Sequence, residues 1–132
     1  MTLKVILDSN FLFLPIQFKI DVFEELKKLL NRQFEPVLLS VTHEELQKIA
    51  LKSGVKTRKR ASLALRLAEK CCAVDVEQDD KETNDDVILR VAKEWKCPVA
   101  TNDQALRRRL RDINLPVIYL RQKSRLELEG SI

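Results

Sequence analysis

Acidic residues follow four short apolar runs in this sequence, and their chemistry suggests what they could do together. The runs are "LKVIL", "PVLLS", "CAVDV" and "CPVAT", and the acids that come after them are Asp8, Glu45, Asp85, Asp86 and Asp103. Carboxylates that lie close together repel one another and take up protons unless a cation offsets their charge. Mg²⁺ and Mn²⁺ prefer carboxylate and water oxygens, and such ions activate water and neutralise phosphate charge. If these acids meet in space, they predict metal-dependent hydrolysis of phosphodiester bonds.

Each acid also has a local structural explanation, and the sequence leaves both roles open. The segments "THEE" and "TNDD" have the form of a capping box, in which a threonine and an acid three residues later bond each other's backbone amides. Asp103 could cap its own helix, and "DSN" after the first apolar run is a common turn sequence. The two roles differ in geometry: a capping Glu45 turns back to the amide of Thr42, whereas a ligand points across the site.

Three neutral hydrogen-bonding residues stand beside these acids, namely Asn10, Thr101 and Asn102. Such side chains orient the carboxylates or the water around a metal ion. They are equally suited to turns and helix caps, so both interpretations are kept.

Alternating strand and helix patterns explain how acids so far apart in the chain could meet. The apolar runs predict strands at residues 3–7, 36–40, 72–76, 97–101 and 116–120. Helical periodicity predicts helices over residues 21–30, 43–52, 57–70, 84–95 and 103–112. Right-handed crossovers between such strands give a parallel sheet covered on both faces, with the carboxyl ends of the strands along one edge. Ligands bind at that edge, so the predicted topology brings the acids together.

Two basic segments favour a polyanionic partner. The segment "KTRKR" contributes Lys56, Arg58, Lys59 and Arg60 at the start of a predicted helix, and "RRRLR" contributes Arg107 and Arg108 a few residues beyond Asp103. Cations at a helix N-terminus oppose the helix dipole, so phosphate contact would explain the first segment better than helix stability does. The formal net charge of +4 agrees with a nucleic-acid partner.

Composition excludes several other classes of protein. The length of 132 residues suits one domain, predicted over residues 1–122, with residues 123–132 as a C-terminal tail. Three cysteines without a C-x-x-C pair and a single histidine argue against a zinc site. No apolar run approaches the ~20 residues of a membrane span, and the N-terminus lacks a secretory leader. We therefore expect a cytoplasmic protein without a membrane partner.

The segments "VILDSN", "THEEL", "NDDVIL" and "VATNDQALRRRL" occur in the order and context of the PIN-domain nucleases, and the chain resembles that family over residues 3–120. The resemblance implies a three-layer α/β/α sandwich around a central five-stranded parallel sheet. It implies a Mg²⁺- or Mn²⁺-dependent endoribonuclease that hydrolyses RNA, usually single-stranded, with a metal-activated water held in an acidic pocket.

The resemblance also implies roles for individual residues. The four acids of the family correspond to Asp8, Glu45, Asp86 and Asp103, and Thr101 corresponds to the small hydroxyl residue before the last acid. Metal ligands would come from Asp8, Asp86 and Asp103. Asp85 is the alternate third acid and could join them.

Two branches of the family and one inactive variant remain as alternatives. The ending "VATND…LRRRLRD…PVIYL" is more similar to archaeal and eukaryotic PIN domains of ribosomal-RNA processing, although the zinc-binding extension of some of those is missing. VapC-type toxins often carry an aromatic residue where this chain has Leu106. The toxin branch would add an antitoxin partner, and a homodimer is expected of many members. The third alternative is a catalytically weak module that binds RNA or protein, for example in ribosome biogenesis.

Overall fold

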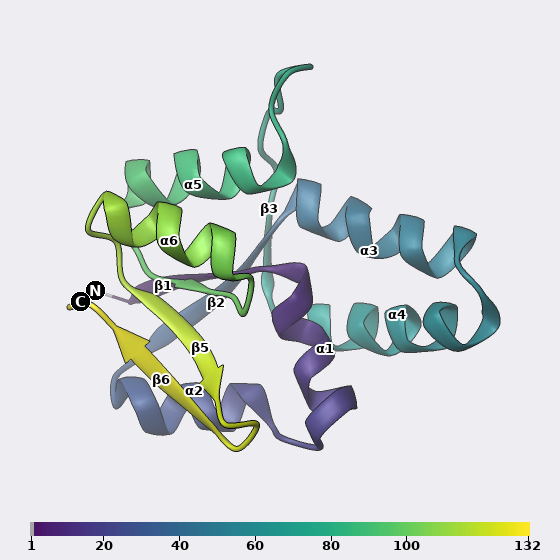
Figure 1. Cartoon of the computed structure of the whole chain (residues 1–132), viewed down its shortest axis with the longest axis horizontal. Helices are drawn as coiled ribbons and strands as arrows, with labels where there is room; N and C mark the ends of the chain where they lie inside the picture. The colour runs from purple at the N-terminus through teal and green to yellow at the C-terminus, as the bar shows by residue number, and fades with distance from the viewer. Residues whose placement is uncertain (1) are drawn as a thin grey trace.

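A single mixed sheet forms the centre of the protein in a computed structural model, which describes residues 2–132 (Figure 1). The sheet order is β3-β2-β1-β4-β5-β6. The strands are β1 (Leu3–Leu7), β2 (Phe34–Leu39), β3 (Cys72–Val74), β4 (Val99–Ala100), β5 (Val117–Arg121) and β6 (Arg125–Glu129). Neighbours from β3 to β5 pair in parallel, and β6 pairs antiparallel with β5. The strand order reverses between β1 and β4, which is where open α/β sheets bind ligands.

Helices cover both faces of this sheet. They are α1 (Ser9–Phe18), α2 (Val22–Leu30), α3 (Ser40–Lys52), α4 (Val55–Ala68), α5 (Asn84–Trp95) and α6 (Gln104–Asp112). Figure 1 shows α5 and α6 on one side of the sheet and α2 on the other, while α3 and α4 form a hairpin that extends beyond the sheet. The predicted three-layer α/β fold is therefore confirmed.

Strand β1 shows why two separate apolar layers form. Its side chains alternate between the faces, so that Ile6 packs with the core under α5 and α6, whereas Val5 and Leu7 pack with the core against α1 and α2. All three side chains are fully buried. The part of a strand that is buried on both faces is apolar, which explains the run of Val5, Ile6 and Leu7 before Asp8, whereas Lys4 nearer the start of the strand is exposed.

Three expectations differ from the structure. The sheet has a sixth, antiparallel strand, because residues 123–132, predicted as a tail, contain β6. Helix α1 was not predicted, since Pro15 and the four consecutive bulky apolar residues before it hide its helical period. The helix predicted from residue 43 begins three residues earlier, at Ser40, directly after β2. None of the helices in residues 2–132 is both long and apolar enough to span a bilayer.

Candidate active site

Asp8 lies at the carboxyl end of β1, where it also caps the N-terminus of α1. The residue is only 4% exposed. Its Oδ1 accepts a hydrogen bond from the backbone amide of Ser9 at 2.8 Å. Its Oδ2 accepts from Asn10 Nδ2 at 2.8 Å and from Thr101 Oγ1 at 2.8 Å. Donors from α1 and from the residue that follows β4 thus fix the orientation of this buried carboxylate.

The neutral residues beside the acids connect neighbouring strand ends. Thr101 is fully buried after β4, and its Oγ1 also accepts from the Asp103 amide at 3.1 Å. Asn10 Oδ1 accepts from the Asn102 amide at 2.9 Å, and Asn102 Oδ1 accepts from the Leu120 amide of β5 at 2.8 Å. This network ties the ends of β1, β4 and β5 together directly under the candidate site.

Burial and nearby acids make the charge on Asp8 costly. Loss of hydration raises the pKa of Asp8 above its ordinary value of 3.8. The hydrogen bonds from Thr101 and Ser9 oppose that increase, while the negative charges of Glu45 and Asp103 add to it. The increase dominates, so the site favours an added positive charge.

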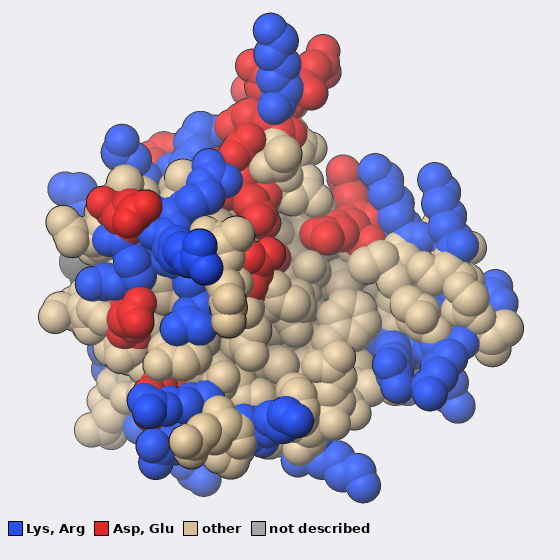
Figure 2. All heavy atoms as spheres, in the orientation of Figure 1, with Lys and Arg blue, Asp and Glu red and all other residues tan. Residues whose placement is uncertain are grey.

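A cavity of about 400 Å³ lies in front of Asp8. Its lining consists of Asp8, Ser9, Asn10, Glu45, Thr83, Asn84, Asp85 and Asp103. These residues come from the ends of β1 and β4 and from α1, α3, α5 and the caps of α5 and α6. In Figure 2 the acidic atoms form a continuous strip down the middle of the face, with basic atoms on both sides.

Asp103 is both a helix cap and a cavity residue. Its Oδ1 accepts from the amides of Ala105 at 2.9 Å and Leu106 at 3.1 Å at the start of α6. Both capping bonds use one oxygen, so the capping role leaves Oδ2 available to the cavity. The two interpretations of Asp103 are therefore compatible.

Glu45 is not part of a capping box. Because α3 begins at Ser40, Thr42 lies inside the helix, and its buried hydroxyl has no hydrogen-bond partner among the described residues. Glu45 Oε2 instead faces Asn84 Nδ2, at 3.4 Å across the cavity. Of the two geometries considered from the sequence, Glu45 has the one that points across the site.

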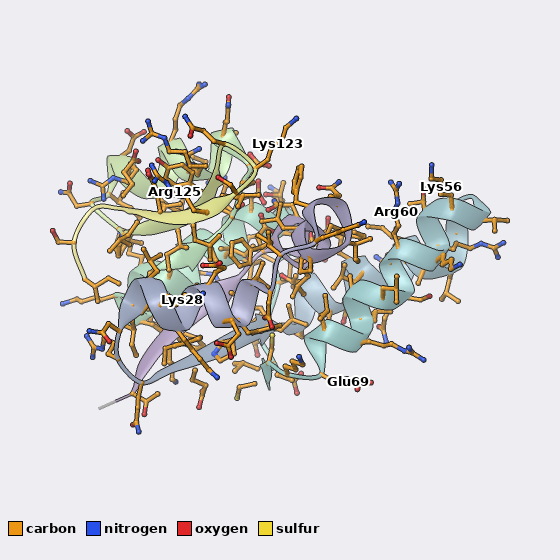
Figure 3. All side chains as sticks on the ribbon, turned by 90° about the horizontal axis from the view of Figure 1, so that it is seen from below. Lys28, Lys56, Arg60, Glu69, Lys123 and Arg125 are labelled. Atoms are coloured by element: carbon orange, nitrogen blue, oxygen red, sulfur yellow. The ribbon has the colours of Figure 1, made fainter. Side chains whose placement is uncertain are left out.

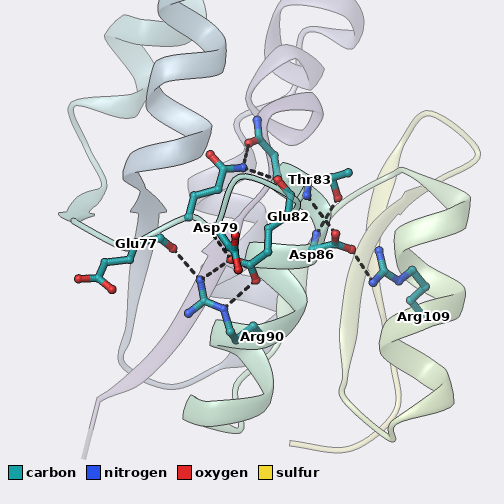
Figure 4. Close-up of polar contacts among 9 residues, drawn as sticks. Glu77, Asp79, Glu82, Thr83, Asp86, Arg90 and Arg109 are labelled. Carbon is teal, nitrogen blue, oxygen red and sulfur yellow. Dashed lines mark hydrogen bonds and ion pairs between the residues drawn. The ribbon is translucent and has the colours of Figure 1, made fainter.

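Asp85 and Asp86 have different surroundings, and of the two only Asp85 is part of the cavity lining. Asp86 Oδ2 accepts from the Thr83 amide at 3.0 Å, which completes the capping box of α5, and Asp86 Oδ1 accepts from Arg109 Nη2 at 2.8 Å (Figure 4). These bonds lower the pKa of Asp86, the Thr83 amide most and Arg109 next. Asp86 is therefore engaged outside the cavity lining.

Asp85 lines the cavity in its place. Burial raises its pKa most, and the negative charges of Asp8 and Asp103 raise it further, while Arg109 lowers it. Neighbouring residues of a helix are about 100° apart around its axis, so when Asp86 turns back to cap α5 the adjacent Asp85 faces the cavity.

The acids share a cavity but not a compact metal site. Within residues 2–132 no three side chains of His, Cys, Asp or Glu are close enough together to hold one ion. The convergence expected from the sequence is thus partial.

The two basic segments differ in their partners. On α4, Lys56, Arg58, Lys59 and Arg60 are all exposed, and Figure 3 shows Lys56 and Arg60 projecting on the same side of that helix. On α6, the Arg107 guanidinium stacks on the Tyr119 ring at 3.7 Å, and its Nη2 lies 4.0 Å from Glu129 Oε2. Arg108 lines a separate cavity beside α6.

Three residues of the cavity were not predicted as site residues, namely Ser9, Thr83 and Asn84. The amide of Ser9 bonds Asp8, Thr83 caps α5, and Asn84 contacts Glu45. Asn84 could have been found, because the first residue after a capping threonine lies at the helix end that meets the sheet edge. Ser9 could have been found only by recognising α1.

Comparison with known proteins identifies the family. A family model described as a PIN like domain matches residues 5–123. Ribonuclease VapC4 of Methanocaldococcus jannaschii is 34% identical over 132 residues, which cover 98% of each chain. The rRNA-processing protein fcf1 of Schizosaccharomyces pombe is also 34% identical, over 117 residues that cover 86% of this chain and 57% of fcf1.

A solved structure supports the same assignment. The PIN domain endonuclease Utp24 superimposes with a TM-score of 0.81 at 29% sequence identity, covering 98% of this chain and 92% of that chain. Relatives from the toxin-like and the rRNA-processing branches are equally identical to the chain, so similarity supports both. The family model covers most of the chain and VapC4 matches nearly all of it at 34% identity, and the protein therefore belongs to the PIN-like domain family.

Proposed function

We propose that this protein is a metal-dependent endoribonuclease that hydrolyses phosphodiester bonds of single-stranded RNA in the acidic cavity. The observation that carries the proposal is the buried Asp8 carboxylate, which three hydrogen-bond donors hold at a cavity also lined by Glu45, Asp85 and Asp103. Stability alone does not account for this arrangement, because burial and like charges both disfavour it.

The donor chemistry of the cavity fits Mg²⁺ or Mn²⁺. Every titratable group in its lining is a carboxylate, and the remaining polar groups are amide and hydroxyl groups, without thiol or imidazole. We assign Asp8, Asp85 and Asp103 as the residues that would hold the ion, with water molecules completing its coordination, because no three acidic side chains within residues 2–132 are close enough together to bind it directly. When bound, it would lower the pKa of a water molecule and offset the charge of the phosphate.

The residues of the chain have separate tasks in this proposal. Thr101, Asn10 and the Ser9 amide hold Asp8 in one orientation and favour its ionised form. Asp103 keeps its capping bonds through one oxygen and offers the other. Glu45, positioned beside Asn84, would orient the attacking water and accept its proton.

The names of the relatives agree with the proposed reaction. VapC4 is named a ribonuclease, and Utp24 is described as an endonuclease. We extend these activities to the present chain, with RNA as the substrate and the cytoplasm as its location. The proposal covers both branches of the family: ribosomal RNA as the substrate, in line with the name of the rRNA-processing protein fcf1, or the RNA target of a toxin.

Cleavage of an unstructured, end-labelled RNA with Mn²⁺ or Mg²⁺ tests the proposal. Wild-type protein should cut the RNA, and both chelator and Asp8→Asn should reduce the rate by at least about 100-fold, as expected for loss of a group that acts on the transition state. Asp80→Asn, an exposed aspartate outside the cavity lining, is the matched control and should keep full activity. Activity that survives equally in Asp8→Asn and in chelator would overturn the proposal.

The wide spacing of the acids favours one second candidate, a PIN-like module that binds RNA or a protein without useful catalysis. Such a module predicts salt-sensitive RNA binding that chelator does not change. It also predicts that no divalent ion yields cleavage products. The same cleavage and binding assays therefore separate the two candidates.

A further inference from the structure

The α3–α4 hairpin carries basic side chains that extend beyond the positions singled out in the sequence. Lys48 and Lys52 on α3 are exposed, as are Lys56, Lys59 and Arg60 on α4. Figure 2 shows basic atoms along both margins of this hairpin, a strip of uncharged atoms between them, and the acidic strip at the end nearest the sheet. The hairpin is thus a basic arm attached to an acidic centre.

Ion pairing distinguishes this arm from the other basic segment. On α6, Arg109 pairs with Asp86 at 2.8 Å, and Arg107 and Arg111 share Glu129 at 4.0 and 3.6 Å. A phosphate that bound there would compete with carboxylates already in place. Across residues 2–132, none of the basic residues of the hairpin is part of an ion pair.

The periodicity of α3 relates the arm to the cavity. Lys48 and Lys52 follow the cavity residue Glu45 by three and seven residues, so all three lie on one side of the helix. With a rise of 1.5 Å per residue, Lys48 and Lys52 lie roughly 4.5 and 10.5 Å further along the axis than Glu45. A polyanion that follows this face meets two cations in succession and then reaches the acids.

Helix stability does not explain the cations on α4. The helix begins at Val55 without a side-chain cap, and Lys56 and Arg58 lie in its first turn, where the dipole disfavours positive charge. Such placement costs a few tenths of a kcal/mol for each cation. Contact with phosphate would offset that cost.

We propose that the α3–α4 hairpin binds the sugar-phosphate backbone of single-stranded RNA, with Lys48 and Lys52 leading it to the cavity and Lys56 and Arg60 holding it on the outer part of the arm. The inference rests on the proposed ribonuclease function. It assigns the principal RNA-binding surface to the hairpin and a minor part to α6, where carboxylates already occupy most of the arginines.

Binding assays with neutralised variants test this assignment. Anisotropy of a short fluorescent single-stranded RNA would be measured in chelator with Asp8→Asn protein, so that cleavage does not interfere. Lys48→Gln with Lys52→Gln, and separately Lys56→Gln with Arg60→Gln, should each raise Kd on the order of tenfold at about 0.1 M salt. Each pair should also reduce the slope of log K against log salt by about 1.4, which corresponds to two lost phosphate contacts.

The matched control changes the same charge elsewhere. Lys93 and Lys96 are exposed at the C-terminal end of α5, opposite to the end that meets the cavity. Lys93→Gln with Lys96→Gln should change Kd by less than about threefold, because general charge loss acts weakly at a distance.

The outcomes separate this inference from the proposed function. If wild-type protein cleaves RNA but the hairpin pairs bind like the Lys93 and Lys96 control, the hairpin assignment is wrong and the nuclease proposal stands. A greater loss from Arg107→Gln with Arg108→Gln would likewise overturn it in favour of α6. If the hairpin pairs weaken binding while no metal ion yields cleavage, the binding surface stands and catalysis fails. If Asp8→Asn protein with an unchanged hairpin does not bind RNA at all, the hairpin assignment is also wrong.

Discussion

Asp86 and Arg109 form an ion pair of 2.8 Å that joins the first turn of α5 to α6, just outside the acidic cavity (Figure 4). Asp86 simultaneously completes the capping box with Thr83. Asp85 on α5 and Asp103 at the start of α6 line the cavity. The pair thus connects the two helices that carry these cavity acids, and Arg109 also lowers the pKa of Asp85.

The contrast between adjacent aspartates gives the first prediction. Asp85→Asn should reduce the RNA cleavage rate by at least about 100-fold, because it removes a carboxylate assigned to the metal ion. Asp86→Asn should retain activity within roughly tenfold and act through the position of α5, so the reversed pair Asp86→Arg with Arg109→Asp should recover more activity than either single reversal. Single-turnover rates at saturating metal provide the measurement. Equal losses from Asp85→Asn and Asp86→Asn would contradict the assignment.

The raised pKa of Asp8 gives a prediction about stability and pH. Between the ordinary value of 3.8 and the higher folded-state pKa, the folded protein binds more protons than the unfolded chain. The Asp8 contribution to the free energy of unfolding therefore falls as pH rises through that window. Asp8→Asn removes this loss and also removes the negative charge that raises the pKa of Asp85. The free energy of unfolding of the mutant relative to wild type should therefore increase with pH. The increase should be about 1.4 kcal/mol for each unit by which the folded-state pKa is raised.

Urea unfolding of metal-free wild type and Asp8→Asn over a pH series measures this difference. Only the pH dependence of the difference in unfolding free energy between the two proteins is diagnostic. The substitution alters the hydrogen bonds with Ser9, Asn10 and Thr101 at every pH and so adds a constant to that difference. A difference that stays constant from acid to neutral pH would show that the folded-state pKa of Asp8 is not raised.

Metal binding gives a third prediction that needs no catalysis. A metal ion at about ten times its Kd stabilises the folded protein by about 1.4 kcal/mol and should raise the Tm by roughly 4–8 °C. Chelator should return the Tm to its starting value. Asp8→Asn should lose most of the increase, whereas Asp86→Asn should keep it, since Asp86 is engaged by Thr83 and Arg109. An increase of the same size in Asp8→Asn would mean that the ion binds elsewhere.

Much of the cavity could be predicted from the sequence because topology, not spacing, brings its acids together. Asp8 and Asp103 follow parallel strands that are neighbours in the sheet, so strand order alone places them at one edge. The choice between Asp85 and Asp86 depends on which of them caps helix α5. The "TNDD" capping box uses one carboxylate oxygen of Asp86 and Arg109 uses the other, so Asp86 is engaged outside the cavity that Asp85 lines.

The surroundings of α6 could not be predicted, and one missed strand explains why. Glu129, which lies 4.0 Å from Arg107 and 3.6 Å from Arg111, is the last residue of β6. Without β6 those arginines appear unpaired and suited to phosphate. The strand has a period-two pattern in "RLELE", with Leu126 buried and Arg125 exposed, but five residues at the end of a chain are weak evidence for a strand.

The role of β6 in stability gives the last prediction. Leu126 is 6% exposed and packs with the core that includes Leu26 of α2, and it pairs across the sheet with Leu120. Leu126→Ala should therefore lower the free energy of unfolding by about 2–4 kcal/mol, the usual cost of removing a buried leucine side chain. The exposed Lys123→Ala in the preceding turn should change it by less than about 0.5 kcal/mol. Denaturant unfolding measures both, and a Leu126→Ala protein as stable as wild type would show that residues 123–132 are a tail and not a strand of the sheet.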